Sequence, residues 1–457
     1  MENVFSAFMS EAIAESQLGY LTFCVLIRYN KSLISREVVS MRKVLIIVLV
    51  LSLFLLAGSI FAKTIVTFWN SMGGPFRQPL NQIISEFNAQ HPNIEIKSIF
   101  MDDYTVLSEK LLSAAISGHL PTMSLVYSNW TARLMKSNLV QPMQTFIDNP
   151  SIGLSKSQLD NIWKVFLKAN TWNGKIYTLP FNKSIYLLFV NKDALMLDGL
   201  GIPKTIPELI KDAKILTMKN ASGKVIQYGL GLRTTVDTFE VFLRQMGGHI
   251  LNSNYTKVLL TSPVALNTLK MLVKLVKSGT TFAQGGYLDG PFGNGRIAMF
   301  ISTSAGIPFT ARSVGGKFTW TVAPIPKGKT QAPPFAGTDL AIFKTASKGQ
   351  QIAAWKFVKF LLKPEVQAFW AIKTGYLPVV KTALDTQAWK IYSDENPMAK
   401  VLVSQIPFAS FDPGIAQWSS IRTIVGNAVS AAMHFKETPE QALQYAQKQI
   451  NKLLNAK

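Results

Sequence analysis

MRKVLIIVLVLSLFLLAGSIFAKTIVTFWN, residues 41–70, is the stretch that decides the fold. Two basic residues follow its methionine, an apolar segment interrupted only by Ser52 runs from 44 to 56, and Ala62 ends a group of small residues. A positively charged region, an apolar region and a small-residue cleavage site are the parts of a secretory signal. The apolar segment is shorter than the about 20 residues that a membrane-spanning helix needs. We therefore expect a signal peptide over 41–62 that is cleaved after Ala62. A retained membrane anchor is the alternative.

The segment after this signal, TIVTFW at 64–69, has the β-branched and aromatic character of a first strand. The segment before it is unusual, because a signal peptide does not follow 40 other residues. We interpret 1–40 as a mis-called N-terminal extension without function. The alternative is that 18–27 forms a second weak apolar patch.

Cysteine usage limits the chemistry of the secreted part. Cys24 is the single cysteine of the chain and lies in the extension. A chain that begins at Lys63 would contain none, which excludes disulfides, thiolate metal sites and a cysteine nucleophile. No cysteine stands at the cleavage site to carry a lipid anchor. We expect a periplasmic or extracellular protein that is secreted by a cleavable signal and has no lipid anchor.

Length and charge suggest two domains and leave the partner open. About 395 residues remain after the signal, which suits two domains of about 200 residues. The net charge of the whole chain is +21, so nucleic acid is the first candidate partner. The lysines are scattered, however, with no run of five or six like charges. A soluble anionic ligand or an anionic surface fits the charge equally well, and we expect no nucleic acid.

Strands and helices alternate over residues 64–127, which predicts a parallel sheet covered by helices. The expected strands are 64–69, 94–99 and 123–127, with helices near 80–87 and 107–115 between them. Ligands bind beyond the carboxyl ends of such strands. Trp69, Tyr104, Ser128 and Trp130 all lie at or just after these ends. A second alternating run begins near residue 180, and a helix headed by Thr438-Pro439-Glu440 ends the chain.

Catalytic motifs are absent from the sequence. The four histidines are scattered and none forms a metal-binding pair. No phosphate-binding loop and no GxSxG nucleophile motif occurs. Gly229 and Gly231 form a GxG, but Thr234 stands where a dinucleotide loop needs its third glycine. We expect a protein that is not an enzyme and that uses no cofactor and no metal.

An ordered set of motifs resembles the extracellular solute-binding proteins of ABC importers (family 1), and among them most closely the sn-glycerol-3-phosphate binders. The motifs are FWxSMxG at 68–74, FN at 87–88, DY at 103–104, LPFNxS at 179–184, VNKDAL at 190–195, FGNGRIAM at 292–299, TGYLPV at 374–379, SIR at 420–422 and TPEQAL at 438–443. The resemblance covers essentially all of 64–455.

The resemblance implies an α/β, two-lobed periplasmic-binding-protein fold in which each lobe is a sheet flanked by helices and the ligand lies in the cleft between them. The implied first lobe comprises 63–181 and 305–363, and the second comprises 182–304 and 364–457. About three crossings would join the lobes, near 181–183, 302–306 and 362–366.

Residues at ligand-contacting positions of the glycerol-phosphate binders can be carried over individually. They are Tyr104, Ser184, a serine within 302–304 (Ser302 or Ser304), Gly337, Tyr376 and Arg422. An arginine fork suits phosphate, a glycine lets its N–H approach an anion closely, and tyrosine and serine hydroxyls are hydrogen-bond donors. The plainer alternative is that Tyr376 packs and that Arg422 is a surface charge.

Two positions depart from the pattern, and two tryptophans add a second possibility. Ser128 stands where these binders usually carry an acidic residue, and Arg233 stands near their tryptophan. Arg233 could instead be solvated. Trp69 and Trp130 could be platforms for a sugar or ordinary core residues. The identity of the ligand therefore stays open at this point.

The resemblance implies a monomeric binding component that carries a sugar, glycerol-3-phosphate or a glycerophosphodiester to membrane permease subunits and their ATPase. A neutral mono- or oligosaccharide is the alternative ligand. A secreted hydrolase of phosphorylated polyols would need a metal or a nucleophile with its base, and the sequence shows neither. A basic surface-binding protein is the third possibility, and it would bind polyanions in a strongly salt-dependent way.

Overall fold

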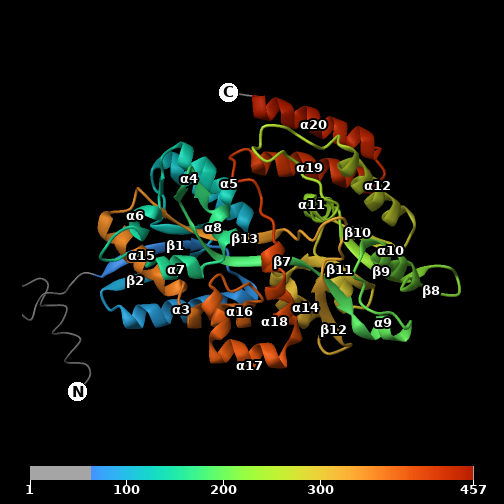
Figure 1. The fold of residues 1–457 in the computed structure, drawn as a ribbon, viewed down its shortest axis with the longest axis horizontal. Helices are drawn as coiled ribbons and strands as arrows, with labels where there is room; N and C mark the ends of the chain where they lie inside the picture. The colour runs from blue at the N-terminus through green and yellow to red at the C-terminus, as the bar shows by residue number, and fades with distance from the viewer. Residues whose placement is uncertain (1–62, 456–457) are drawn as a thin grey trace, which may run out of the picture. The chain divides into compact units, whose positions relative to one another are not determined.

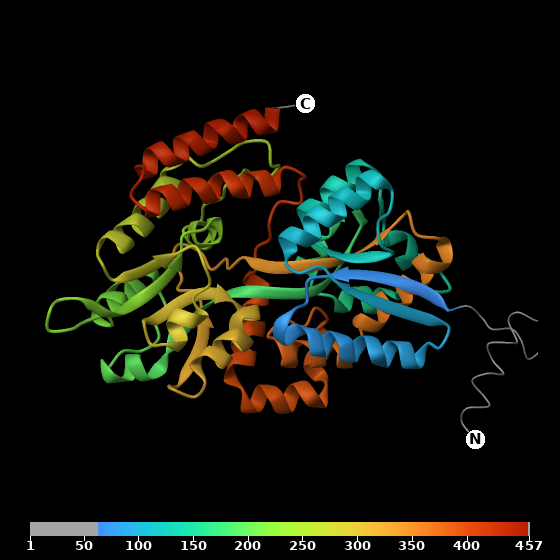
Figure 2. The ribbon, with the colours of Figure 1, turned by 180° about the vertical axis from the view of Figure 1, so that it is seen from behind.

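The computed structural model describes residues 63–455 (Figures 1 and 2). The expected extension and signal, 1–62, lie outside the described residues. From Lys63 onward the chain forms one compact unit. Among the described residues no helix is both long and apolar enough to cross a membrane.

The N-terminal half has the alternation that the sequence predicts. Its first elements are β1 (Thr64–Asn70), α3 (Arg77–Gln90), β2 (Ile94–Phe100), α4 (Tyr104–Ser117) and β3 (Met123–Val126). β1 pairs in parallel with β2 on one side and β3 on the other. The α/β class and the first strand are thereby confirmed.

Strand β7 (Leu179–Asn191) connects the two halves of the sheet. Its first half pairs antiparallel with β13 (Phe335–Phe343), and its second half pairs antiparallel with β11 (Ile297–Thr303) and β12 (Trp320–Pro324). The resulting strand order is β10-β9-β11-β7-β13-β3-β1-β2. β7 runs through the middle of the ribbon beside β13 (Figure 1). Nearly every residue of β7 is buried, as expected for a strand covered on both faces.

The remaining elements are the helices around this sheet and the other strands, of which β5 and β6 form a separate two-stranded sheet. The helices are η2 (Gly74–Phe76), α5 (Ser128–Lys136), α6 (Gln144–Ile147), α7 (Lys156–Asn161), α8 (Lys164–Ala169), α9 (Lys192–Leu197), α10 (Ile206–Ile215), α11 (Val236–Gln245), α12 (Pro263–Lys277), α13 (Asp289–Gly293), η3 (Ser304–Gly306), α14 (Ile307–Val314), α15 (Lys348–Leu361), α16 (Pro364–Thr374), η4 (Lys381–Asp385), α17 (Gln387–Glu395), α18 (Pro397–Ser404), η5 (Ile406–Phe408), α19 (Trp418–Met433) and α20 (Pro439–Asn455). The other strands are β4 (Val140–Gln141), β5 (Thr171–Trp172), β6 (Lys175–Ile176), β8 (Met218–Lys219), β9 (Val225–Arg233) and β10 (Thr281–Gln284).

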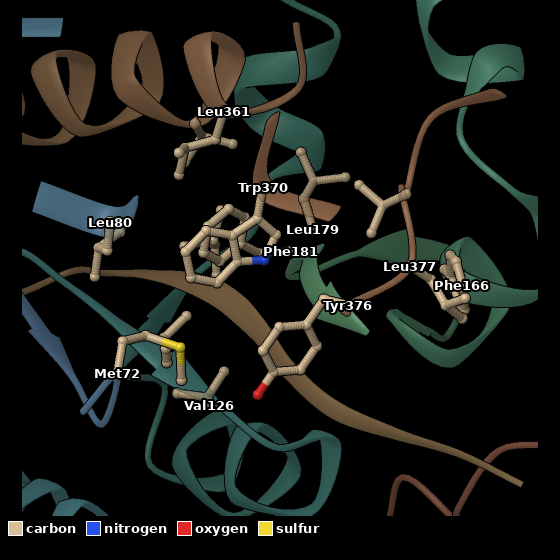
Figure 3. Close-up of a cluster of buried hydrophobic side chains, with 14 of the residues drawn as sticks. Met72, Leu80, Val126, Phe166, Leu179, Phe181, Leu361, Trp370, Tyr376 and Leu377 are labelled. Carbon is tan, nitrogen blue, oxygen red and sulfur yellow. The ribbon is translucent and has the colours of Figure 1, made fainter. Parts of the chain in front are cut away.

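Helix packing differs in detail from the expected lobe boundaries. α16 packs against α3 and η2 of the N-terminal half, whereas α19 and α20 pack with α11 and α12 around the other end of the sheet. β12 pairs with the second half of β7, although 305–363 was assigned to the first lobe. The residue limits of the two lobes therefore stay a proposal. The core beneath α16 gathers Phe181, Trp370 and Tyr376, whose rings stack (Figure 3).

One ion pair is buried where β7 crosses between the halves. Lys183 Nζ lies 2.6 Å from Asp339 Oδ1, and both side chains are inaccessible to solvent. Asn170 Nδ2 donates a second hydrogen bond to the same oxygen at 2.8 Å. Burial lowers the pKa of Lys183 and raises the pKa of Asp339, and their mutual attraction opposes both shifts. The pair therefore couples β7 to β13 directly.

Lys183→Met should lower the free energy of unfolding by about 3–5 kcal/mol, because it leaves the Asp339 carboxylate buried without its partner. Chemical denaturation measures this loss. Lys400→Met is the matched control, since its pair with Asp394 is largely exposed and should contribute about 0–1 kcal/mol. Equal losses in the two variants would show that the buried pair has no special role.

Candidate ligand site between the two halves

One face of β7 carries polar side chains across both halves of the sheet. Because successive residues of a strand point to opposite faces, Asn182, Ser184 and Tyr186 share one face. Asn182 Nδ2 donates to Tyr104 Oη at 3.1 Å, and Asn182 Oδ1 accepts from Thr338 Oγ1 at 2.6 Å. Ser184 and Tyr186 continue this polar row toward β11. The strand thus forms a polar floor beneath both halves.

Aromatic side chains from the ends of β2 and β3 stand above this floor. Asp103 accepts a hydrogen bond from Val106 N at 2.9 Å and caps α4, which fixes Tyr104 at the first position of the helix. The ring of Tyr127 lies 5.2 Å from Tyr104 and 5.0 Å from Trp130, edge to face in both cases. Tyr104 and Trp130 of the expected set are therefore brought together by Tyr127.

Tyr376 joins this cluster from a distant part of the chain. Gly375 ends α16 in the left-handed conformation, with a φ of +73°. The next ring stacks on Trp370 at 5.8 Å, and its hydroxyl lies on the side away from the indole (Figure 3). Its phenol lies close enough to Tyr104 for each to affect the pKa of the other. Tyr376 therefore packs on Trp370 and also belongs to the tyrosine cluster.

The phenols of this cluster stay neutral at ordinary pH. Burial raises the pKa of Tyr104, and it raises the pKa of Tyr127, Tyr186 and Tyr376 well above the usual value. For Tyr127 and Tyr376, the neighbouring Tyr104 adds to the rise. A neutral phenol donates one hydrogen bond and also accepts, so these hydroxyls match hydroxyl groups of a ligand.

Carboxylates surround Arg422, which the sequence assigned to phosphate. Arg422 lies in the first turns of α19, and its Nη2 donates to Asp237 Oδ1. Its Nη1 lies 3.4 Å from both Glu240 Oε2 and Asp412 Oδ2. Arg244 Nη2 lies 2.9 Å from the other oxygen of Glu240. Three carboxylates therefore share two guanidinium groups at this wall of the site.

The shifts in pKa within this network have opposite signs. Burial would raise the pKa of Asp237, but Arg422 lowers it below the usual value, so Asp237 remains ionised. Burial, followed by repulsion from Asp412, raises the pKa of Glu240 to about 7. Burial would lower the pKa of Arg422, but its carboxylate neighbours, Asp237 first, raise it well above its usual value. Arg422 is therefore a cation already balanced by acids.

Arg233 lies near the same wall. Its guanidinium stands 4.6 Å above the ring of Tyr287 and donates from Nε and Nη2 to Gly285 O, both at 3.2 Å. Its positive charge lowers the pKa of Asp237 and of Tyr186. Arg233 is thus close enough to act on the site, in a fixed orientation.

The other expected residues have varied positions. Ser128 begins α5 and is half-buried, as is Trp69, which lies on β1 on the face opposite Phe68. Ser302 is half-buried on β11, whereas Ser304 is fully buried and its hydroxyl accepts from Ile185 N at 3.4 Å.

Gly337 is required by its backbone. Its φ is +103°, and a Cβ there would lie 1.9 Å from Asn182 O. This close approach lets β13 pair with β7 directly under the polar floor. The position needs glycine for sheet geometry, whatever it contributes to a ligand.

The two halves contact each other at the edge of the site. Asn129 Nδ2 on α5 donates to Ser419 Oγ on α19, and Trp172 Nε1 donates to Gly414 O at 2.7 Å. A small cavity of about 110 Å³ lies between these elements, lined in part by Trp130. A wider hollow of about 750 Å³ lies beside α20, but none of the aromatic residues described above lines it. The polar and aromatic residues described above therefore lie between the two halves, away from this wider hollow.

Several residues of this arrangement were not predicted from the sequence. They are Tyr127, Asn182, Tyr186, Asp237, Tyr287, Thr338 and Asp412. The alternation of Asn182, Ser184 and Tyr186 was visible in the sequence, but only the strand register gave it a common face. Nothing local distinguished Asp237, which is 185 positions from Arg422. Within residues 63–455, no group of three His, Cys, Asp or Glu side chains could hold a metal ion.

Residues 82–398 match the family model of bacterial extracellular solute-binding proteins. The chain belongs to this family. It is the solute-binding protein of an ABC importer, and the predicted family is confirmed. The chain is 29% identical over 424 residues to the sn-glycerol-3-phosphate-binding periplasmic protein UgpB of Escherichia coli strain K12, covering 87% of this chain and 94% of that protein.

Solved structures of similar fold support the two-lobed architecture. UgpB of Mycobacterium tuberculosis in complex with glycerophosphocholine has a TM-score of 0.76 and 21% identity, covering 85% of this chain and 98% of that one. The GacH receptor of Streptomyces glaucescens, a structure set that includes an acarbose complex, has a TM-score of 0.75 and 20% identity, covering 86% and 99%. The predicted two-lobed α/β fold is therefore confirmed.

The raised pKa of Glu240 predicts how stability depends on pH. The folded pKa of about 7 exceeds the ordinary 4.5, so the folded state holds this proton more tightly. The contribution of Glu240 to stability is therefore present below pH 4.5 and is lost as pH rises through about 7. The thermal midpoint of Glu240→Gln, relative to that of the unmodified protein at the same pH, should therefore be higher at pH 8 than at pH 5.

Thermal unfolding of both proteins at the two pH values measures this change. Glu109→Gln on the exposed face of α4 is the control and should show no such change. The same difference in midpoint between the Glu240 variant and the unmodified protein at both pH values would contradict the assignment.

Proposed function

We propose that this importer protein captures a small solute rich in hydroxyl groups, a sugar or a glycerol derivative, between its two lobes. One observation carries this proposal: neutral tyrosine hydroxyls and the Asn182–Thr338 pair meet at a single polar floor. Such groups donate and accept equally well, as a polyol requires. The tyrosine rings add flat apolar surfaces for the C–H faces of a sugar or glycerol unit.

Capture would involve movement of the lobes about β7. Asn182, Ser184 and Thr338 are buried, so a ligand reaches them only when the lobes part. The contacts Asn129–Ser419 and Trp172–Gly414 would form on closure and break on opening. The closed monomer would then dock on the permease subunits, whose ATPase drives transport. The protein itself would carry out no reaction.

The relatives suggest which compounds to test first. Proteins named for sn-glycerol-3-phosphate and one solved with glycerophosphocholine place glycerol derivatives among the probes. The acarbose complex places an oligosaccharide-like ligand beside them. A hydrolase of phosphorylated polyols would instead turn over such esters. An assay for released phosphate, with and without added divalent metal, should show no turnover.

Tyr104→Phe and Tyr376→Phe should each weaken binding of the preferred probe about 2- to 13-fold, because each removes one hydroxyl hydrogen bond of about 0.5–1.5 kcal/mol. Calorimetric titration with glycerol-3-phosphate, glycerophosphocholine and maltotriose measures the affinities. Tyr445→Phe on the exposed face of α20 is the matched control and should bind like the unmodified protein. Unchanged affinity in both site variants would refute the polyol site.

We also propose that 41–62 is a signal peptide and that the secreted protein begins at Lys63. The support is the charged, apolar and small-residue order of this stretch and the start of the compact unit at Lys63. N-terminal sequencing of protein secreted by the producing cell should read Lys63-Thr64-Ile65. A secreted product that retains Met41 would contradict cleavage.

A further inference from the structure

We infer that Asp237, held in place by Arg422, sets the charge that a ligand may carry at the second wall of the site. Its carboxylate accepts hydrogen bonds from a hydroxyl-bearing ligand and disfavours a phosphate dianion. This inference rests on the proposed function, because it concerns the same site. It also gives Arg422 a new role, as the residue that positions Asp237.

Exposure separates Asp237 from Glu240, whereas Asp412, which is 36% exposed, already accepts from Trp418 Nε1 at 2.8 Å. Glu240 is only 3% exposed and lies behind Arg422, enclosed between the two arginines. Asp237 keeps 25% of its side-chain surface exposed, in the first turn of α11. It lies close enough to Tyr186, on the polar face of β7, for its charge to raise the pKa of that phenol. Asp237 is therefore the carboxylate that joins the polar floor.

The carboxylates that contact Arg422 disfavour phosphate binding by its guanidinium group. Both terminal nitrogens of its guanidinium contact carboxylates, Nη2 with Asp237 and Nη1 with Glu240 and Asp412. A bidentate phosphate contact needs two parallel N–H groups of the same fork. A phosphate would have to displace at least one carboxylate and would then lie beside it. Like charges so close in a partly desolvated site repel strongly.

The groups that face Arg422 do not supply the positive charge that a phosphate would need. Tyr104, Tyr127 and Tyr376 are neutral, and Asn182 and Thr338 carry no charge. Arg244 is paired with Glu240, and Arg233 lies against the ring of Tyr287 and donates to Gly285 O. The net charge of +21 is therefore a property of the remaining surface and does not describe the site.

Asp237→Asn tests this inference directly. The amide keeps the shape and an oxygen that can accept from Arg422, while the charge is removed. The ratio of the affinities for glycerol-3-phosphate and maltotriose, measured at pH 7.5 and fixed salt, should shift toward glycerol-3-phosphate by about 10-fold or more. Asp237→Glu keeps the charge and should retain the ratio of the unmodified protein.

Glu440→Gln is the matched control. It also removes one negative charge, from an exposed pair with Lys270 on the far helices, and should leave the ratio unchanged. Asp237→Ser repeats the test if the asparagine variant fails to fold, because it also removes the charge.

The outcomes distinguish a failure of the proposed function from a failure of the role of Asp237. If the unmodified protein binds none of the probes, including glycerophosphocholine, the proposed function fails and this inference fails with it. If it binds at least one probe but the neutral variants leave the ratio unchanged, or shift it toward maltotriose, only the role of Asp237 is refuted. An equal shift in Glu440→Gln would mean that net charge alone is responsible, which also overturns the inference.

Discussion

The pairing of β7 with strands of both halves is the constraint on which the rest of the structure depends. Thirteen residues of one extended segment bond to β13 along the first half and to β11 and β12 along the second. The alternation of side chains along this strand then has two consequences. Asn182, Ser184 and Tyr186 face the site, while Lys183, on the opposite face, is paired with Asp339 in the interior. One strand thus provides both the connection between the lobes and the floor of the site.

The electrostatics of the site differ from those of the whole chain. Excess lysine and arginine give the protein a strong positive charge, yet three carboxylates gather around Arg422. Buried charges need partners, and this network provides them within the protein before any ligand arrives. A solute that binds beside this network meets an environment in which positive and negative charges are already nearly balanced. On the proposed function, neutral hydroxyls, which donate and accept, are the groups that recognise the ligand.

The local elements could be predicted well because their signals are local. Thr438-Pro439 heads α20 as expected, and Asp103 heads α4, since caps and helix starts depend on neighbouring residues. The β-α-β order from Thr64 to Val126 followed from periodicity. The allocation of later segments to lobes was harder. Whether α16 packs on α3 or on α19 depends on the path of the chain, which no local pattern records.

For the site, the sequence by itself determined the family, the motifs and a set of residues, of which Tyr104, Trp130, Tyr376 and Arg422 lie in or beside one cluster. Tertiary structure alone decided which groups each of them contacts. Arg422 looked like a free fork because two of its three carboxylates are remote in sequence: Asp237 is 185 positions away and Glu240 is 182, whereas Asp412 is 10. The sequence gives the charge of a side chain, but the effect of that charge depends on which groups share its low-dielectric surroundings. Only the packing of α11 against α19 brings those groups together.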